Sequence, residues 1–172
     1  MATPTSSSSP MRAATGPQVD PRGQRFAAWL TAAVLVVVLV SAPSTLATVL
    51  LAAQALVFLS GVALGPARTP YSWLFRTFVR PRLGAPAETE SALPPRFAQG
   101  VGLVFAVVAL AGAVAGSTPV VLVAAGMALA AAFLNAAFGF CLGCEMYLLG
   151  LRLIPRDRLS HAATVLRDSA VH

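Results

Sequence analysis

Two cysteines and one acidic residue share a short segment, Cys141-Leu142-Gly143-Cys144-Glu145. Two thiols three residues apart can close a disulfide with each other or share a metal ion. Disulfide exchange requires a thiolate, which is favoured at the N-terminus of a helix. The segment therefore predicts a dithiol site in which Cys141 or Cys144 attacks. Cys141 is preferred, because it would lie nearer the start of a helix. The alternative is that both are small apolar residues that pack well in a helix.

Glu145 is the only acidic residue within an apolar run, and in a helix it shares a face with Cys141. We include it with the two cysteines in the candidate site, where it could accept a proton from a thiol. The competing interpretation is an ion pair with Arg152 or with an arginine of the central loop. A zinc ion takes four ligands, and the only further candidates are His161 and His172 in a polar tail. We therefore expect no metal ion and no cofactor.

The composition indicates a lipid environment for the segments around this site. Of the 172 residues, 57% are hydrophobic and only 10% are charged, whereas soluble domains carry roughly 25% charged residues. All twelve basic residues are arginines, and they lie between apolar segments rather than on one basic face. The net charge of +6 therefore does not indicate nucleic-acid binding. The length fits one compact domain.

Four apolar runs, free of Asp, Glu and Arg, lie at residues 26–42, 46–65, 97–116 and 120–138. Each has close to the ~20 residues that a helix needs to cross ~30 Å of hydrocarbon. Backbone groups in lipid must bond to one another, so the runs are expected to be helices. The predicted fold is an all-α membrane protein with four transmembrane helices in two hairpins. This domain spans residues 20–154, between a disordered tail at 1–19 and a polar tail at 155–172.

The arginines predict the orientation of the four helices. All twelve precede the first run, lie between the second and third, or follow the fourth, so they share one side of the membrane. The positive-inside rule makes that side cytoplasmic, with both termini there and the chain in the cell membrane. A cleaved signal peptide ending at Val40-Ser41-Ala42 is the competing interpretation of the first run. Pro43, immediately after that site, argues against cleavage.

The two halves of the chain resemble each other. Arg25-Phe26-Ala27-Ala28 opens the first pair of runs and Arg96-Phe97-Ala98-Gln99 opens the second, about 71 residues later. The pattern predicts an internal duplication with parallel repeats, although apolar low complexity could produce the same similarity.

Short helices at the membrane surface are expected after each pair of runs. Thr69-Pro70 is typical of a helix start, and an amphipathic helix should follow and end at Pro81, with Tyr71 and Trp73 in the headgroup zone. By analogy, residues 141–154 should form a second such helix after a break at Gly139. The alternative is one tilted helix from residue 120 to residue 154, about 50 Å long.

Polar and small residues within the runs suggest helix packing rather than transport. Gln54 and Asn135 lie near mid-membrane and are expected to bond to neighbouring helices. No charged residue lies deep within a run, which disfavours a transport path. Gly112 and Gly116 form a GxxxG pattern that permits close helix packing, within one chain or in a homo-oligomer.

Several stretches resemble a known family. They include Asp20-Pro-Arg-Gly-Gln-Arg-Phe26, Gln54-Ala-Leu-Val-Phe58, Pro95-Arg-Phe-Ala-Gln99 and, most specifically, Asn135 to Tyr147. The chain is similar in these stretches to the domain-of-unknown-function 4395 family, a group of uncharacterised bacterial membrane proteins prominent in actinobacteria. The resemblance implies a multi-pass membrane protein and no established activity. It also implies thioredoxin-like or sulfurtransferase partners as an expectation.

Two functions from different classes follow. In the first, Cys141 and Cys144 form a membrane dithiol that exchanges with a thioredoxin-like or sulfur-carrier partner on the cytoplasmic side. In the second, the chain is a scaffold without chemistry, whose arginine-rich face binds anionic lipid or a partner. Whether the chain is an enzyme stays open at this point.

Overall fold

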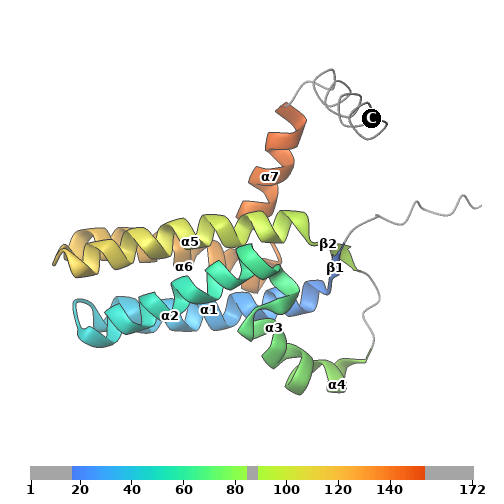
Figure 1. The fold of residues 1–172 in the computed structure, drawn as a ribbon, viewed down its shortest axis with the longest axis horizontal. Helices are drawn as coiled ribbons and strands as arrows, with labels where there is room; N and C mark the ends of the chain where they lie inside the picture. Colours follow the sequence, from blue (N-terminus) through green and yellow to red (C-terminus); the bar gives the residue numbers. More distant parts are fainter. Residues whose placement is uncertain (1–16, 85–88, 154–172) are drawn as a thin grey trace, which may run out of the picture.

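Four long helices form a bundle in the computed structural model, which describes residues 17–84 and 89–153 (Figure 1). They are α1 (Pro21–Ser41), α2 (Thr45–Leu64), α5 (Leu93–Val114) and α6 (Thr118–Phe138). Helix α1 packs against α2 and α6, and helix α5 packs against the same two helices. All four are long and apolar enough to cross a membrane. The expected four-helix membrane fold is confirmed.

The helices begin earlier than the apolar runs do. Helix α1 starts at Pro21 rather than at residue 26, because the Asp20 side chain accepts a hydrogen bond from the Arg22 backbone N–H at 2.9 Å. Helix α5 starts at Leu93 rather than at residue 97, with prolines in its first turn. Hydropathy marks only the part that suits hydrocarbon, whereas caps and prolines start a helix in its polar first turn.

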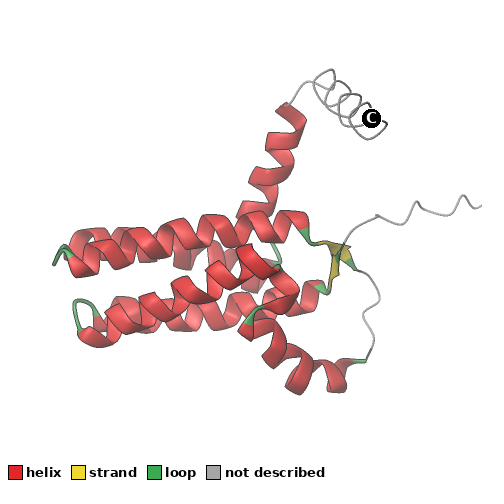
Figure 2. Ribbon diagram, viewed as in Figure 1, coloured by secondary structure: helices red, strands yellow, loops and turns green. Residues whose placement is uncertain are grey.

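A two-stranded sheet joins the start of the bundle to the central loop (Figure 2). Strand β1 (Gln18–Val19) pairs antiparallel with β2 (Glu90–Ser91), and the Val19 side chain is buried. Residues 18 and 19, expected in the N-terminal tail, lie in this strand. Residues 1–16 and the expected tail at 155–172 lie outside the described residues.

The bundle is packed tightly at the end with the short turns. Leu35 and Val38 of α1 are buried there against Leu51 of α2. Further residues of α2, α5 and α6, nearly all alanines, complete this core: Ala47, Ala109, Val121, Ala124, Ala125 and Ala128. Large apolar side chains such as Val40 (84% exposed) and Leu56 (66% exposed) point outward. Such an apolar exterior suits lipid rather than water.

A bent helical segment follows α2 at the other end of the bundle. After the short helix η1 (Pro66–Arg68) come α3 (Pro70–Leu74), the π-helical turn η2 (Phe75–Val79) and α4 (Arg80–Leu83). Thr69 caps α3 as expected, since its side chain accepts from the Ser72 N–H at 3.2 Å. The expected end at Pro81 is wrong. Pro81 lies in the first turn of α4, where a proline is tolerated, and the segment continues to Leu83.

Helix α6 ends at Phe138, and a separate helix α7 (Leu142–Leu153) projects away from the bundle (Figure 1). Gly139 has a φ of +69°, the left-handed conformation that glycine adopts at little cost, and its N–H bonds to the Asn135 carbonyl at 3.0 Å. The expected break at Gly139 is confirmed, and the single straight helix is excluded.

The two halves of the bundle make matching contacts. Arg25 of α1 donates to the Ala136 and Ala137 carbonyls at the end of α6, and Arg96 of α5 donates to carbonyls at the end of α2. Two aromatic pairs, Phe26 with Phe75 and Phe97 with Tyr147, have equal centroid separations of 5.7 Å and interplanar angles of 45° and 46°. These contacts support the duplication, which stays a proposal.

Candidate functional site: a dithiol at the start of α7

The two cysteines lie at the start of α7. Cys141 immediately precedes the helix, and its carbonyl accepts the first helical hydrogen bond from the Glu145 N–H at 3.0 Å. Cys144 lies in the first turn. Both are free thiols and partly buried. In a helix, residues three apart have Cα atoms about 5 Å from each other, inside the roughly 4.4–6.8 Å that a disulfide spans.

The pKa of Cys141 is lowered to about 7, mainly because the Cys144 thiol donates a hydrogen bond to its sulfur. Burial opposes this shift, while the backbone N–H groups of Cys144 and Gly143 contribute to it. The charge of Glu145 raises the pKa slightly. Cys141 therefore holds the position at the open N-terminal turn where a thiolate is stabilised.

The pKa of Cys144 is raised well above its usual value. Its thiol proton is used in the hydrogen bond to Cys141, and burial and the charges of Cys141, Glu90 and Glu145 also disfavour its ionisation. The two thiols are therefore unequal. Cys141 is suited to attack, and Cys144 is suited to hold a proton until Cys141 has reacted.

Gly143, between the two cysteines, lets α7 approach α5 closely. A Cβ atom at this position would lie 2.7 Å from both the Cα and the Cβ of Ala98. Tyr147, one turn further on, packs against Phe97 of α5. The glycine of the motif is therefore a packing residue that positions both thiols. Sequence reasoning missed this role, although a glycine inside a C-x-x-C pattern is a signal that could have suggested it.

Glu145 is exposed on α7. Within residues 17–84 and 89–153 the only salt bridge joins Asp20 to Arg22, so the expected pairing of Glu145 with an arginine is not found there. No cluster of three His, Cys, Asp or Glu residues able to hold a metal ion forms in the same part of the chain. His161 and His172 lie outside it.

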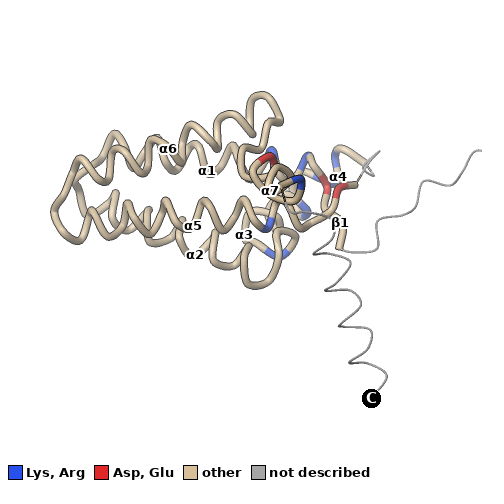
Figure 3. Tube along the Cα trace, turned by 90° about the horizontal axis from the view of Figure 1, so that it is seen from above, with Lys and Arg blue, Asp and Glu red and all other residues tan. Residues whose placement is uncertain are grey.

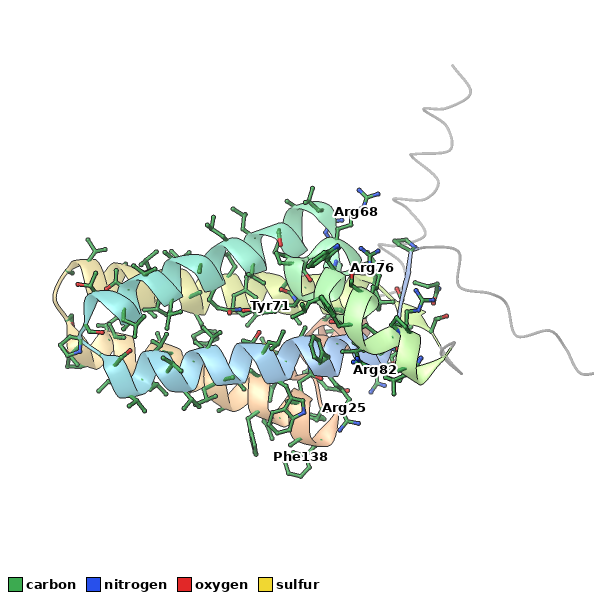
Figure 4. All side chains as sticks on the ribbon, turned by 90° about the horizontal axis from the view of Figure 1, so that it is seen from below. Arg25, Arg68, Tyr71, Arg76, Arg82 and Phe138 are labelled. Carbon is green, nitrogen blue, oxygen red and sulfur yellow. The ribbon has the colours of Figure 1, made fainter. Side chains whose placement is uncertain are left out.

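A chain of two hydrogen bonds links α3, α2 and α1 inside the bundle. The Tyr71 hydroxyl donates to Gln54 Oε1 at 2.8 Å, and Gln54 Nε2 donates to Thr31 Oγ1 at 3.4 Å. The bonding expected for Gln54 is confirmed. The expected headgroup position of Tyr71 is wrong, because its ring points into the bundle (Figure 4), where burial raises the pKa of its hydroxyl.

Removal of this hydroxyl should weaken the joint between α3 and α2. Tyr71→Phe leaves Gln54 Oε1 without its hydrogen-bond donor, and the Gln54 residue is only 1% exposed. We expect a loss of about 1 kcal/mol in the free energy of unfolding, measured by thermal unfolding in detergent. Trp73→Phe, at an exposed position of the same helix, is the control and should change little.

Charged residues gather at the end of the bundle where α7 begins (Figure 3). The arginines of the bent segment, Arg76, Arg80 and Arg82, are exposed there, as is Arg152 of α7. The opposite end, with the two short turns, carries no charged residue. This asymmetry places the dithiol on the charged side of the apolar bundle.

A bundle of four apolar, membrane-length helices with a surface helix defines a multi-pass helical membrane protein. More particularly, the chain belongs to the DUF4395 family, a domain of unknown function, whose model matches residues 19–152. The matched region covers the whole described bundle and both cysteines. No curated protein and no solved structure matches the chain significantly.

Proposed function

We propose that this protein is a membrane dithiol that exchanges a disulfide with a soluble partner. The observation that carries the proposal is the inequality of the two thiols at the start of α7. Cys141, with a pKa of about 7, is the attacking thiol, and Cys144 keeps its proton. A pKa near ambient pH combines a large thiolate fraction with good nucleophilicity.

The exchange runs in two steps. The Cys141 thiolate attacks one sulfur of a partner disulfide, a mixed disulfide forms, and the other partner sulfur leaves as a thiolate. Cys144 then loses its proton and attacks the Cys141 sulfur, so that Cys141 and Cys144 become a disulfide and the partner becomes a dithiol. Two electrons pass to the partner, and the reverse sequence returns them. A thioredoxin-like or sulfur-carrier protein is the proposed partner class.

Trapping of the mixed disulfide tests this function. Cys144→Ser removes the thiol that resolves the mixed disulfide, so it should accumulate a covalent adduct through Cys141 that reductant releases. Cys141→Ser is the matched control and should accumulate none. Differential alkylation of the wild-type thiols, before and after an oxidant challenge of intact cells, should show a reversible shift to the disulfide. Cysteine thiols that never oxidise and form no adduct would contradict the proposed dithiol function.

The dithiol faces the cytoplasm in this proposal, since the arginine-rich end of the bundle should be cytoplasmic. A membrane-impermeant maleimide should therefore not label Cys141 in intact cells, and should label it in inside-out vesicles. A control cysteine at Ser117, in the opposite turn, should show the reverse in a chain whose native cysteines are serines. Labelling of Cys141 from outside would overturn the orientation.

The exposed arginines favour a second function, binding to anionic lipid. Arg76, Arg80 and Arg82 lie on one short segment at the charged end, where each basic residue near an anionic surface contributes about 1 kcal/mol. A scaffold that acts only through this face would keep its function in Cys141→Ser. If the protein acts as a dithiol, Cys141→Ser should abolish its function although the protein is present at its normal abundance.

A further inference from the structure

A cavity of about 260 Å³ lies at the charged end of the bundle, between the start of α1 and the bent segment from η1 to α4. Strand β1 forms a further part of its wall. Gly23 of α1 and Phe75 of η2 both line it, and a Cβ atom at Gly23 would lie 3.2 Å from the Phe75 ring. The volume is several times the roughly 30 Å³ that one water molecule occupies in the liquid. A small polyatomic anion therefore fits.

The two sides of the cavity are held together before and after the arginines of the bent segment. The Phe75 ring packs against Phe26 of α1 with a centroid separation of 5.7 Å. The Arg22 side chain donates to the carbonyls of Leu83 at 3.4 Å and of Gly84 at 3.2 Å, at the end of α4. The backbone between these contacts is thereby fixed relative to α1.

The cavity carries two positive charges without counter-charges. Arg76 and Arg80 both line it and are exposed, and neither has a hydrogen-bond or ion-pair partner among the described residues (Arg76 is labelled in Figure 4). Asp20 also lines the cavity, but its carboxylate is paired with Arg22 at 3.2 Å. Like charges four residues apart on a helical segment destabilise it. An anion between the two guanidinium groups would remove this repulsion.

We propose that this cavity binds a phosphate group between Arg76 and Arg80. A guanidinium group presents its N–H donors as a planar fork, which matches two oxygens of a phosphate, and a tetrahedral phosphate has enough oxygens for both forks. The Gln24 carboxamide, which lines the cavity and has no hydrogen-bond partner among the described residues, adds an uncharged donor. The proposal deepens the second proposed function, because a membrane phospholipid is one source of the phosphate group. A free phosphate is the other source.

Binding of inorganic phosphate tests the cavity itself. The full-length protein in dodecyl maltoside, a detergent without phosphate, is titrated at constant ionic strength, and binding is followed by the broadening of the phosphorus NMR signal. We expect saturable binding that Arg76→Gln and Arg80→Gln each weaken about tenfold, since each removes a charge-assisted contact. Arg82→Gln is the matched control. It removes the same charge from the same segment at a position that does not line the cavity, so affinity should stay within about twofold.

The source of the phosphate is tested by native mass spectrometry after phosphatidylglycerol, or oleate as an anionic lipid without phosphate, is added to the same sample. Retention of one phosphatidylglycerol per chain, but not of oleate, that is lost in Arg76→Gln and kept in Arg82→Gln assigns the group to a lipid. Binding of inorganic phosphate without retained phosphatidylglycerol assigns it to a free phosphate. Either result supports the cavity.

Two results would overturn the cavity as a phosphate site. The first is the absence of both saturable phosphate binding and retained phosphatidylglycerol. The second is an equal loss in Arg76→Gln, Arg80→Gln and Arg82→Gln. This second result would leave the lipid-binding function standing, because diffuse attraction to an anionic surface depends on net charge rather than on one site.

Discussion

Alkylation of Cys141 by iodoacetamide should follow pH with a midpoint of about 7, and Cys144→Ala should move this midpoint toward 9. The Cys144 thiol donates to the Cys141 sulfur, so its removal withdraws the main stabilisation of the thiolate and raises the pKa of Cys141. At pH 7 the thiolate fraction then falls from about one half to about one hundredth. The higher basicity makes the remaining thiolate more nucleophilic, so the rate should fall about fivefold.

The rate at Cys141 is measured on the purified full-length protein by mass spectrometry of the alkylated peptide between pH 5 and pH 10. Cys144→Ser serves as the conservative variant, because a hydroxyl still donates a hydrogen bond and should retain part of the shift. At pH 10 Cys141 is largely ionised in each protein, so Cys144→Ala should then react faster than the wild type, because its thiolate is more basic and more nucleophilic. A wild-type midpoint near 9 would contradict the assignment of Cys141 as the activated thiol.

Substitution of Gly143 by alanine should detach α7 from α5. The added Cβ would lie 2.7 Å from the Cα of Ala98, so a backbone must move rather than a flexible side chain. Overpacking of this kind costs up to about 3 kcal/mol, which is also enough to disrupt the contact of Tyr147 with Phe97. Amide hydrogen exchange in α7 should then accelerate by about a hundredfold, because a helix with fewer packed contacts opens more often.

Gly150→Ala is the matched control for Gly143→Ala. It changes the same residue type in the same helix, and a Cβ at Gly150 meets nothing within 4 Å. Alanine should favour the helix there by up to about 1 kcal/mol, so exchange in α7 should slow or stay unchanged. Equally fast exchange in both variants would show that backbone propensity, and not the contact with Ala98, determines how firmly α7 is held.

The membrane bundle could be predicted because the hydrocarbon core imposes a length and a composition on each helix. The runs at 26–42 and 120–138 correspond closely to the apolar parts of α1 and α6. The break at Gly139 could be predicted for two reasons. One helix over residues 120–154 would be longer than a bilayer is thick, and glycine tolerates a left-handed turn. The two cysteines could be singled out because their spacing suits a disulfide.

The remaining features depend on contacts between distant residues. Tyr71 seemed suited to the headgroup zone, yet it turns inward because the buried amide of Gln54 needs a donor. Pro81 seemed a helix end, yet a π-helical turn before it accommodates the ring. The contact of Gly143 with Ala98 also involves a pair that lies far apart in the sequence. No local pattern reveals such partners.

The arginines that open α1 and α5 make each half of the chain dependent on the other. Arg25 donates to carbonyls at the end of α6, and Arg96 donates to carbonyls at the end of α2, so each half supplies hydrogen-bond donors to the end of the other half's second helix. A chain divided between residues 84 and 89 would leave two pieces that each lack a cap which only the other supplies. Such pieces are suited to complement each other when produced together, and a lone half is suited to pair with its own copy.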